Sequence, residues 1–81
     1  MKAIIHVGLK PGVLDPQGKA VADTLGRMGY NEVSTARISK SIELDLDDGL
    51  SPDAAEARVK EMCEKLLANT VIENYRIEIN A

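Results

Sequence analysis

Residues 32–46 read EVSTARISKSIELDL, and this stretch predicts most of the architecture. From Ala36 to Leu46 the apolar side chains share one parity, which only Lys40 interrupts, while polar and charged side chains occupy the other parity, and this is the period of a β-strand. The alternation keeps its phase between Ser39 and Ser41, where none of the Gly, Pro, Asn or Asp residues typical of a hairpin turn occurs. We therefore expect one long, bent strand, or two strands joined at a kink.

The length of this strand predicts an oligomer. At about 3.3 Å per residue the stretch would extend about 50 Å, which exceeds what an 81-residue globule needs. Part of the strand is then expected to reach past its own core. Because an unpaired strand edge is a template for another chain, we expect self-association through this overhang.

Further strands are predicted near both ends of the chain, at residues 2–9 and 71–79, which alternate with period two. The side chains expected to face inward from these strands are Ala3, Ile5, Val7, Leu9, Val71, Tyr75, Ile77 and Ile79. With two intervening helices the order is β-α-β-α-β, or β-α-β-β-α-β if the long strand is divided. We expect an α+β fold with an antiparallel sheet and both helices on one face, in a single domain over residues 1–81.

The block KPGVLDPQGK, which begins at Lys10, predicts a tight turn followed by a helix. Pro11 and Gly12 suit the centre of a type II turn, because proline fixes the first φ and glycine accepts a positive second φ. Asp15 can cap the helix, and Pro16 suits its first position, where a missing N–H costs nothing.

The two helices are predicted from their caps and their apolar stripes. Gly29 is expected to end the first helix, since glycine readily adopts the left-handed conformation. Ser51 and Pro52 open the second helix, and Asn69 is its expected end. The stripes that would face inward are Val21, Leu25 and Met28 on the first helix, and Ala55, Val59, Met62, Cys63 and Leu66 on the second.

Composition excludes several classes of function. The chain has 10 basic and 13 acidic residues, a balance that argues against binding a phosphate backbone. Two tyrosines are the only aromatic residues, which is too few to form a platform for stacking bases. No apolar run approaches the ~20 residues of a membrane span. We expect a cytoplasmic protein with neither nucleic-acid nor membrane partners.

The residues indicate no catalytic, cofactor-binding or metal site on this chain. A zinc site needs three or four protein ligands, and the sequence offers one His and one Cys. His6 is expected to be half-exposed or at an interface. Cys63 lies within an apolar stripe and is expected to be a small core residue, because reactive thiols lie exposed near positive charge.

Four segments together resemble the PurS family, the small subunit of phosphoribosylformylglycinamidine (FGAM) synthase. They are KPGVLDPQGK at residues 10–19, LGRMGYNEV at 25–33, RISKSIEL at 37–44 and MCEKLLANTVIENYRIEI at 62–79. The resemblance extends over nearly the whole chain, with the blocks in their proper order. It implies a PurS-like fold and an oligomeric, non-catalytic subunit.

The resemblance also implies the reaction and the partners. FGAM synthase is an ATP-dependent ligase complex of purine biosynthesis that converts formylglycinamide ribonucleotide and glutamine to formylglycinamidine ribonucleotide and glutamate, with release of ADP and phosphate. PurQ is its glutaminase subunit and PurL its synthetase subunit, on which ATP and magnesium are expected. A PurS-like chain would form a homodimer or a dimer of dimers, bridge PurQ and PurL, and support ammonia transfer. It would itself bind no cofactor.

Seven residues are candidates for partner contact on the loop and on the long strand: Lys10, Pro11, Gly12, Asp15, Gln17, Arg37 and Lys40. For the loop residues, a purely local role in shaping the turn and starting the helix explains the sequence equally well. An alternative function is a regulatory domain that senses a small ligand, because small α+β domains of this order often bind amino acids at dimer interfaces. Such a domain would bind its ligand alone, whereas a bridging subunit would bind two larger proteins.

Overall fold

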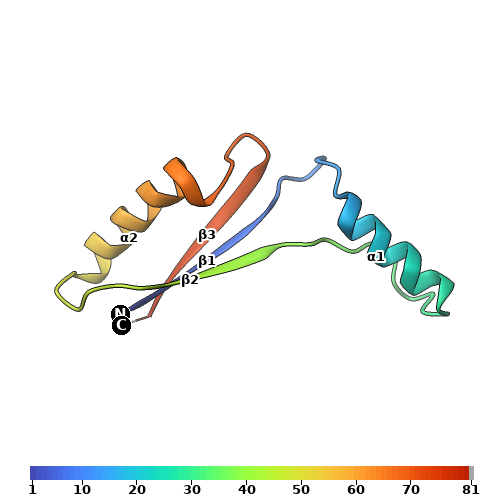
Figure 1. Ribbon diagram of the computed structural model, residues 1–81, viewed down its shortest axis with the longest axis horizontal. Helices are drawn as coiled ribbons and strands as arrows, with labels where there is room; N and C mark the ends of the chain where they lie inside the picture. The colour runs from blue at the N-terminus through green and yellow to red at the C-terminus, as the bar shows by residue number, and fades with distance from the viewer. Residues whose placement is uncertain (81) are drawn as a thin grey trace.

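The computed structural model describes residues 1–80 and shows an α+β chain built on one antiparallel sheet (Figure 1). Its elements in chain order are β1 (Lys2–Leu9), α1 (Pro16–Arg27), β2 (Lys40–Asp45), α2 (Pro52–Met62), the π-helical turn η1 (Cys63–Leu67) and β3 (Glu73–Asn80). Within this range the strands lie in the order β2-β1-β3. The α+β class, the antiparallel sheet and the order of elements expected from the sequence are confirmed. No helix in the described range combines the length and apolar character needed to cross a membrane.

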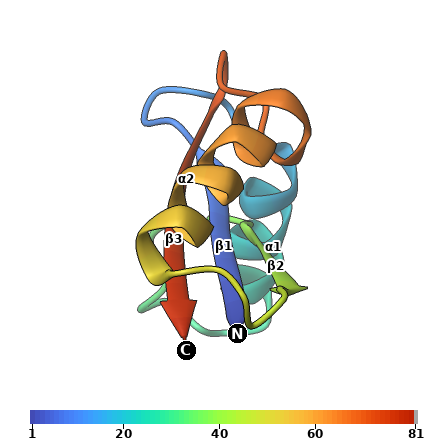
Figure 2. The ribbon, with the colours of Figure 1, turned by 90° about the vertical axis from the view of Figure 1, so that its left-hand side faces the viewer.

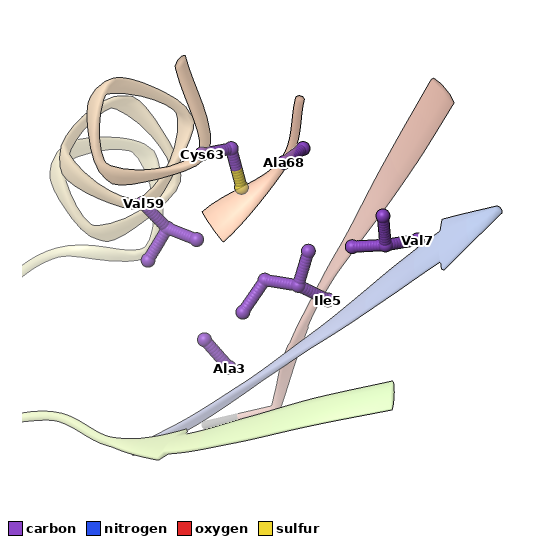
Figure 3. Packing of buried hydrophobic residues seen from close by; sticks show 6 residues of the cluster. All are labelled: Ala3, Ile5, Val7, Val59, Cys63 and Ala68. Carbon is purple, nitrogen blue, oxygen red and sulfur yellow. The ribbon is translucent and has the colours of Figure 1, made fainter. Parts of the chain in front are cut away.

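The core lies between one face of the sheet and α2 (Figures 2 and 3). The central strand β1, which is paired along both edges, supplies three of the six buried residues of the core cluster. Its register places Ile5 opposite Ile42 of β2 and Ile77 of β3, so all three side chains point to the same face. The buried members of the cluster are Ala3, Ile5, Val7, Val59, Cys63 and Ala68.

Helix α2 begins as predicted and ends in a wider turn that the sequence did not predict. Ser51 Oγ accepts a hydrogen bond from Ala54 N at 3.2 Å, which caps the helix. In η1 the bond from Ala68 N to Cys63 O, at 3.1 Å, spans five residues instead of four. Leu67 consequently packs against the core, while Leu66 is 83% exposed. The expectation that Leu66 belongs to the buried stripe was wrong, because the π turn changes the rotation of the chain.

Strand β3 begins at Glu73, two residues later than expected. The preceding turn continues because Ile72 N and Glu73 N both donate to Asn69 O, at 3.1 and 2.8 Å. Glu73 pairs with Leu9, the last residue of β1, so no residue of β1 remains for an earlier start of the ladder. Val71 was expected to face inward, but it lies in the turn and is 81% exposed.

The second half of the predicted long strand joins the sheet as β2. Residues 33–39, which connect α1 to the first residue of β2, have no strand partner among residues 1–80 (Figure 1). The chain therefore contains the overhang that the strand length predicted. It measures 51 × 25 × 14 Å, which is elongated for its size.

Helix α1 lies beyond the end of the sheet, and no strand among residues 1–80 forms an extensive contact with it (Figure 1). The expectation of both helices on one sheet face therefore holds for α2 but not for α1 within this chain. The cause is the extended segment at residues 33–39, which carries α1 away from the core. We call residues 14–39, which comprise α1 and the segment that returns from it, the arm.

Candidate functional site

A tight turn joins β1 to the arm, and we call it the connecting loop, Lys10 to Val13. Val13 N donates to Lys10 O at 3.1 Å, and Gly12 has a φ of +87°. This geometry is the type II turn predicted for Pro11 and Gly12. Lys10 N also donates to Ile72 O at 2.8 Å, which attaches the loop to the turn before β3. The loop therefore has a defined shape on the surface.

Asp15 connects two parts of the arm. Its Oδ1 accepts a hydrogen bond from Gly18 N at 2.8 Å, so the predicted helix cap is confirmed. Its Oδ2 accepts a second bond from Ile38 N, also at 2.8 Å. These two donors, Ile38 first, hold the pKa of the Asp15 carboxyl below its usual range, and the positive charge of Arg37 acts in the same direction. Asp15 is only 9% exposed, so its carboxylate makes hydrogen bonds within the arm rather than with water.

Gly18 lets the first turn of α1 lie directly against the returning segment of the arm. A Cβ atom built at this position would be 2.3 Å from Ala36 O, well inside contact distance. The sequence did not distinguish a glycine needed for close approach from one merely tolerated in a helix. The structure shows that close approach requires it.

Arg37 contacts the connecting loop from the other side. Its Nη2 donates to Leu9 O at 3.1 Å and to Lys10 O at 3.2 Å, and its Nη1 lies 3.5 Å from Val13 O. The fork of guanidinium donors thus binds three carbonyl oxygens that the end of β1 and the loop turn toward it. We call this arrangement the Arg37 clamp.

The structure brings most of the seven candidate residues together at the base of the arm. This group consists of Lys10, Pro11, Gly12, Asp15 and Arg37. Beside it lies an open hollow of about 490 Å³ between the connecting loop, α1 and residues 34–37. Gln17 and Lys40 do not join this network and instead line a smaller hollow of about 200 Å³. Whether any of the seven contacts a partner stays a prediction.

Among residues 1–80, no group of three or more His, Cys, Asp or Glu side chains is placed to hold a metal ion. Cys63 is fully buried in the core as expected, and this burial, with Glu64 nearby, raises the pKa of its thiol. His6 is partly exposed on the sheet face opposite α2, where its Nε2 lies 3.2 Å from Glu78 Oε2. The polar groups at the base of the arm are used to hold main-chain atoms in place.

The fold and this network define a class of protein: a small α+β module in which a helical arm projects from the end of the sheet and is held there by hydrogen bonds to the connecting loop. Residues 2–81 match the family model of PurS, described as phosphoribosylformylglycinamidine (FGAM) synthase. The chain belongs to the PurS family. The membership that the four sequence blocks implied is therefore confirmed.

Relatives and solved structures agree with this assignment over nearly the full chain. The chain is 54% identical over 78 residues to the PurS subunit of FGAM synthase from Bacillus subtilis, covering 96% of this chain and 90% of that one. A crystal form of B. subtilis PurS superposes with a TM-score of 0.88 at 52% identity, covering 99% and 98% of the two chains. A chain of the PurLQS structure from Thermotoga maritima superposes with a TM-score of 0.82 at 34% identity, covering 95% and 93%.

Proposed function

We propose that this chain is the PurS subunit of an FGAM synthase, in which it assembles with the glutaminase PurQ and the synthetase PurL in the cytoplasm. The single observation that carries the proposal is the match to a chain of the PurLQS structure from T. maritima over 95% of this chain. Because the match covers nearly all of both chains, the two chains have the same helices and strands with which to contact partner subunits.

The contribution of this chain to the reaction is structural. The complex joins the ammonia nitrogen released from glutamine to formylglycinamide ribonucleotide, at the expense of ATP. We place the glutaminase chemistry on PurQ and assign ATP and magnesium to PurL. This chain binds no cofactor of its own, holds the two catalytic subunits at a fixed separation and supports the transfer of ammonia between them.

Self-association through the arm is part of the proposal. Of nine large hydrophobic side chains that are exposed in the described chain, five belong to the arm: Leu14, Val21, Met28, Tyr30 and Ile38. Exposed apolar groups concentrated on one projecting element are typical of an interface. A second copy that covers the arm gives a homodimer, and two such dimers give the dimer of dimers.

The experiment is a reconstitution with the PurL and PurQ subunits from the same source. Glutamine-dependent formation of formylglycinamidine ribonucleotide is measured with and without this chain. We expect activity only when all three proteins are present, and none from this chain alone. Equal activity of PurL and PurQ without it would overturn the bridging role. Tight binding of an amino acid by the isolated chain, together with that result, would instead favour a regulatory domain.

A further inference from the structure

The arm is joined to the sheet at only two places. The outgoing connection is the short loop after Leu9, and the returning connection is the main chain between Ser39 and Lys40. Helix α1 makes no extensive contact with any strand among residues 1–80, so packing does not fix its direction. Two backbone crossings alone would leave the arm free to swing, because a hinge needs only a few residues that absorb changes in φ and ψ.

The arm itself is held together separately from these crossings. The Asp15 carboxylate binds Gly18 N in α1 and Ile38 N in the returning segment, both at 2.8 Å. Gly18 allows α1 to touch that segment at Ala36 O. All of these groups belong to the arm, so a swing of the whole arm would break none of these contacts.

The Arg37 clamp is the side-chain contact that links the two crossings. Arg37 stands in the returning segment, and its guanidinium binds carbonyl oxygens of Leu9, Lys10 and Val13 in the outgoing one, at 3.1, 3.2 and 3.5 Å. A swing of the arm at the connecting loop must pull these oxygens from the guanidinium. Hydrogen bonds to a charged donor are about twice as strong as neutral ones, so this contact opposes a swing of the arm.

We propose that Arg37 acts as a lock on this hinge, which holds the arm in the direction that a second copy of the chain requires. The inference rests on the proposed self-association through the arm and names the residue that prepares the arm for it. Loss of the lock leaves both the arm and the sheet folded but spreads the arm over many directions. The apparent affinity then falls with the square of the fraction of chains in the competent direction, because both copies of the homodimer must be competent.

The direction of the arm can be measured by pulsed electron spin resonance between two spin labels. One label is placed at Arg27→Cys on α1 and the other at Glu56→Cys on α2, both exposed positions. Cys63 stays unlabelled in the folded chain because it is fully buried. The measurement is made in a Val21→Lys background, which charges the exposed side of α1 and keeps the chains monomeric.

We expect one narrow distribution of distances with Arg37 present and a distribution at least twice as wide in Arg37→Ala. Arg37→Lys should fall between them, because an ammonium group cannot reproduce the fork that reaches three carbonyls. Arg76→Ala, which removes a guanidinium from an exposed position of β3, is the matched control and should keep the narrow distribution. Slow exchange of the Ile38 amide proton shows in each variant that the arm is still folded.

Self-association is measured in parallel without the Val21→Lys change. We expect Arg37→Ala to raise the dissociation constant at least tenfold and Arg76→Ala to leave it within twofold. Because both copies of the homodimer must have a competent arm, a tenfold rise corresponds to a competent fraction of about one third in the unlocked arm. An unchanged distance distribution in Arg37→Ala would overturn the lock. If Arg37→Ala fails to fold, an unchanged distribution in Arg37→Lys would do the same.

Two further outcomes separate the lock from the proposed function. A wider distribution with unchanged self-association would overturn the inference that assembly depends on the direction of the arm. A chain that stays monomeric at all concentrations with Arg37 intact would instead contradict the self-association, while the label distances would still test the lock.

Discussion

The Asp15 carboxylate and the Ile38 backbone N–H lie 2.8 Å apart, although 23 positions separate them in the sequence. The same carboxylate caps α1 through Gly18 N. One side chain therefore starts a helix and fastens the segment that returns from it. This double role of Asp15 holds the start of α1 and the returning segment of the arm together.

The stability of the chain should fall in acid partly through Asp15. Because its folded-state pKa lies below the unfolded value, its contribution is fully present above the unfolded pKa and is lost as pH falls through the folded pKa. We expect Asp15→Asn to unfold about 5 °C lower at pH 7, and to lose less stability than the parent chain below about pH 4. Thermal unfolding across pH measures both effects. Asp53→Asn on the exposed start of α2 controls for loss of charge, and an identical acid profile for the parent chain and Asp15→Asn would contradict the prediction.

Two glycines of α1 should respond in opposite ways to a methyl group. Gly18→Ala forces a Cβ against Ala36 O and should destabilise the chain by about 1–3 kcal/mol. A Cβ at Gly26 meets nothing within 4 Å, so Gly26→Ala should stabilise the chain by about 0.5–1 kcal/mol through helix propensity. Denaturant unfolding of both variants provides the comparison. Equal effects would mean that α1 does not lie against the returning segment.

The π turn predicts different costs for two neighbouring leucines. Leu67→Ala should cost about 2 kcal/mol, because Leu67 packs against the core. Leu66→Ala should change the free energy of unfolding by less than about 0.5 kcal/mol, because its side chain is 83% exposed. An α-helical continuation beyond Cys63 would bring Leu66 closer to the core, so a large loss for Leu66→Ala would argue against the π turn.

Charge on the exposed side of α1 should dissociate the oligomer without unfolding the chain. Val21 is 41% exposed, and we expect Val21→Lys to convert the oligomer to monomers in sedimentation experiments. The reason is that an interface which buries this side chain must desolvate the new charge. Arg58→Lys, on the exposed side of α2, should leave the oligomer intact. An unchanged sedimentation coefficient for Val21→Lys would exclude this side of α1 from the interface.

The buried thiol should react slowly in the native state. Burial in the core raises the pKa of Cys63, and Glu64 adds to this shift, so little thiolate forms at pH 8. We expect a thiol reagent to modify the unfolded chain at least 100-fold faster than the native chain, because Cys63 is fully covered by its neighbours. Rapid modification without denaturant would show that η1 opens readily.

The sequence by itself determined the family and most of the local structure, although neither the π turn nor the start of β3. Alternation defined β1, and the caps at Asp15 and Ser51 defined where both helices begin. The positive φ of Gly12 and of Gly29 matches the predicted turn and helix end. These features depend on residues a few positions apart, which is the range that periodicity and capping describe. The four family blocks needed no structure at all.

Only the tertiary structure decided where the predicted parts lie. The apolar stripe on α1 indicates that another surface must pack against this helix. It does not indicate that the sheet of the same chain lies too far away to do so. Asp15 was predicted only as a helix cap, yet its carboxylate also binds Ile38 N, 23 positions away. Arg37 was expected only as a candidate partner contact, yet its guanidinium binds Leu9 O, 28 positions away. By its spacing Leu66 belongs to the apolar stripe of α2, but the π turn directs its side chain toward the solvent. Such contacts form between segments that come together only on folding, so no local pattern of side chains records them.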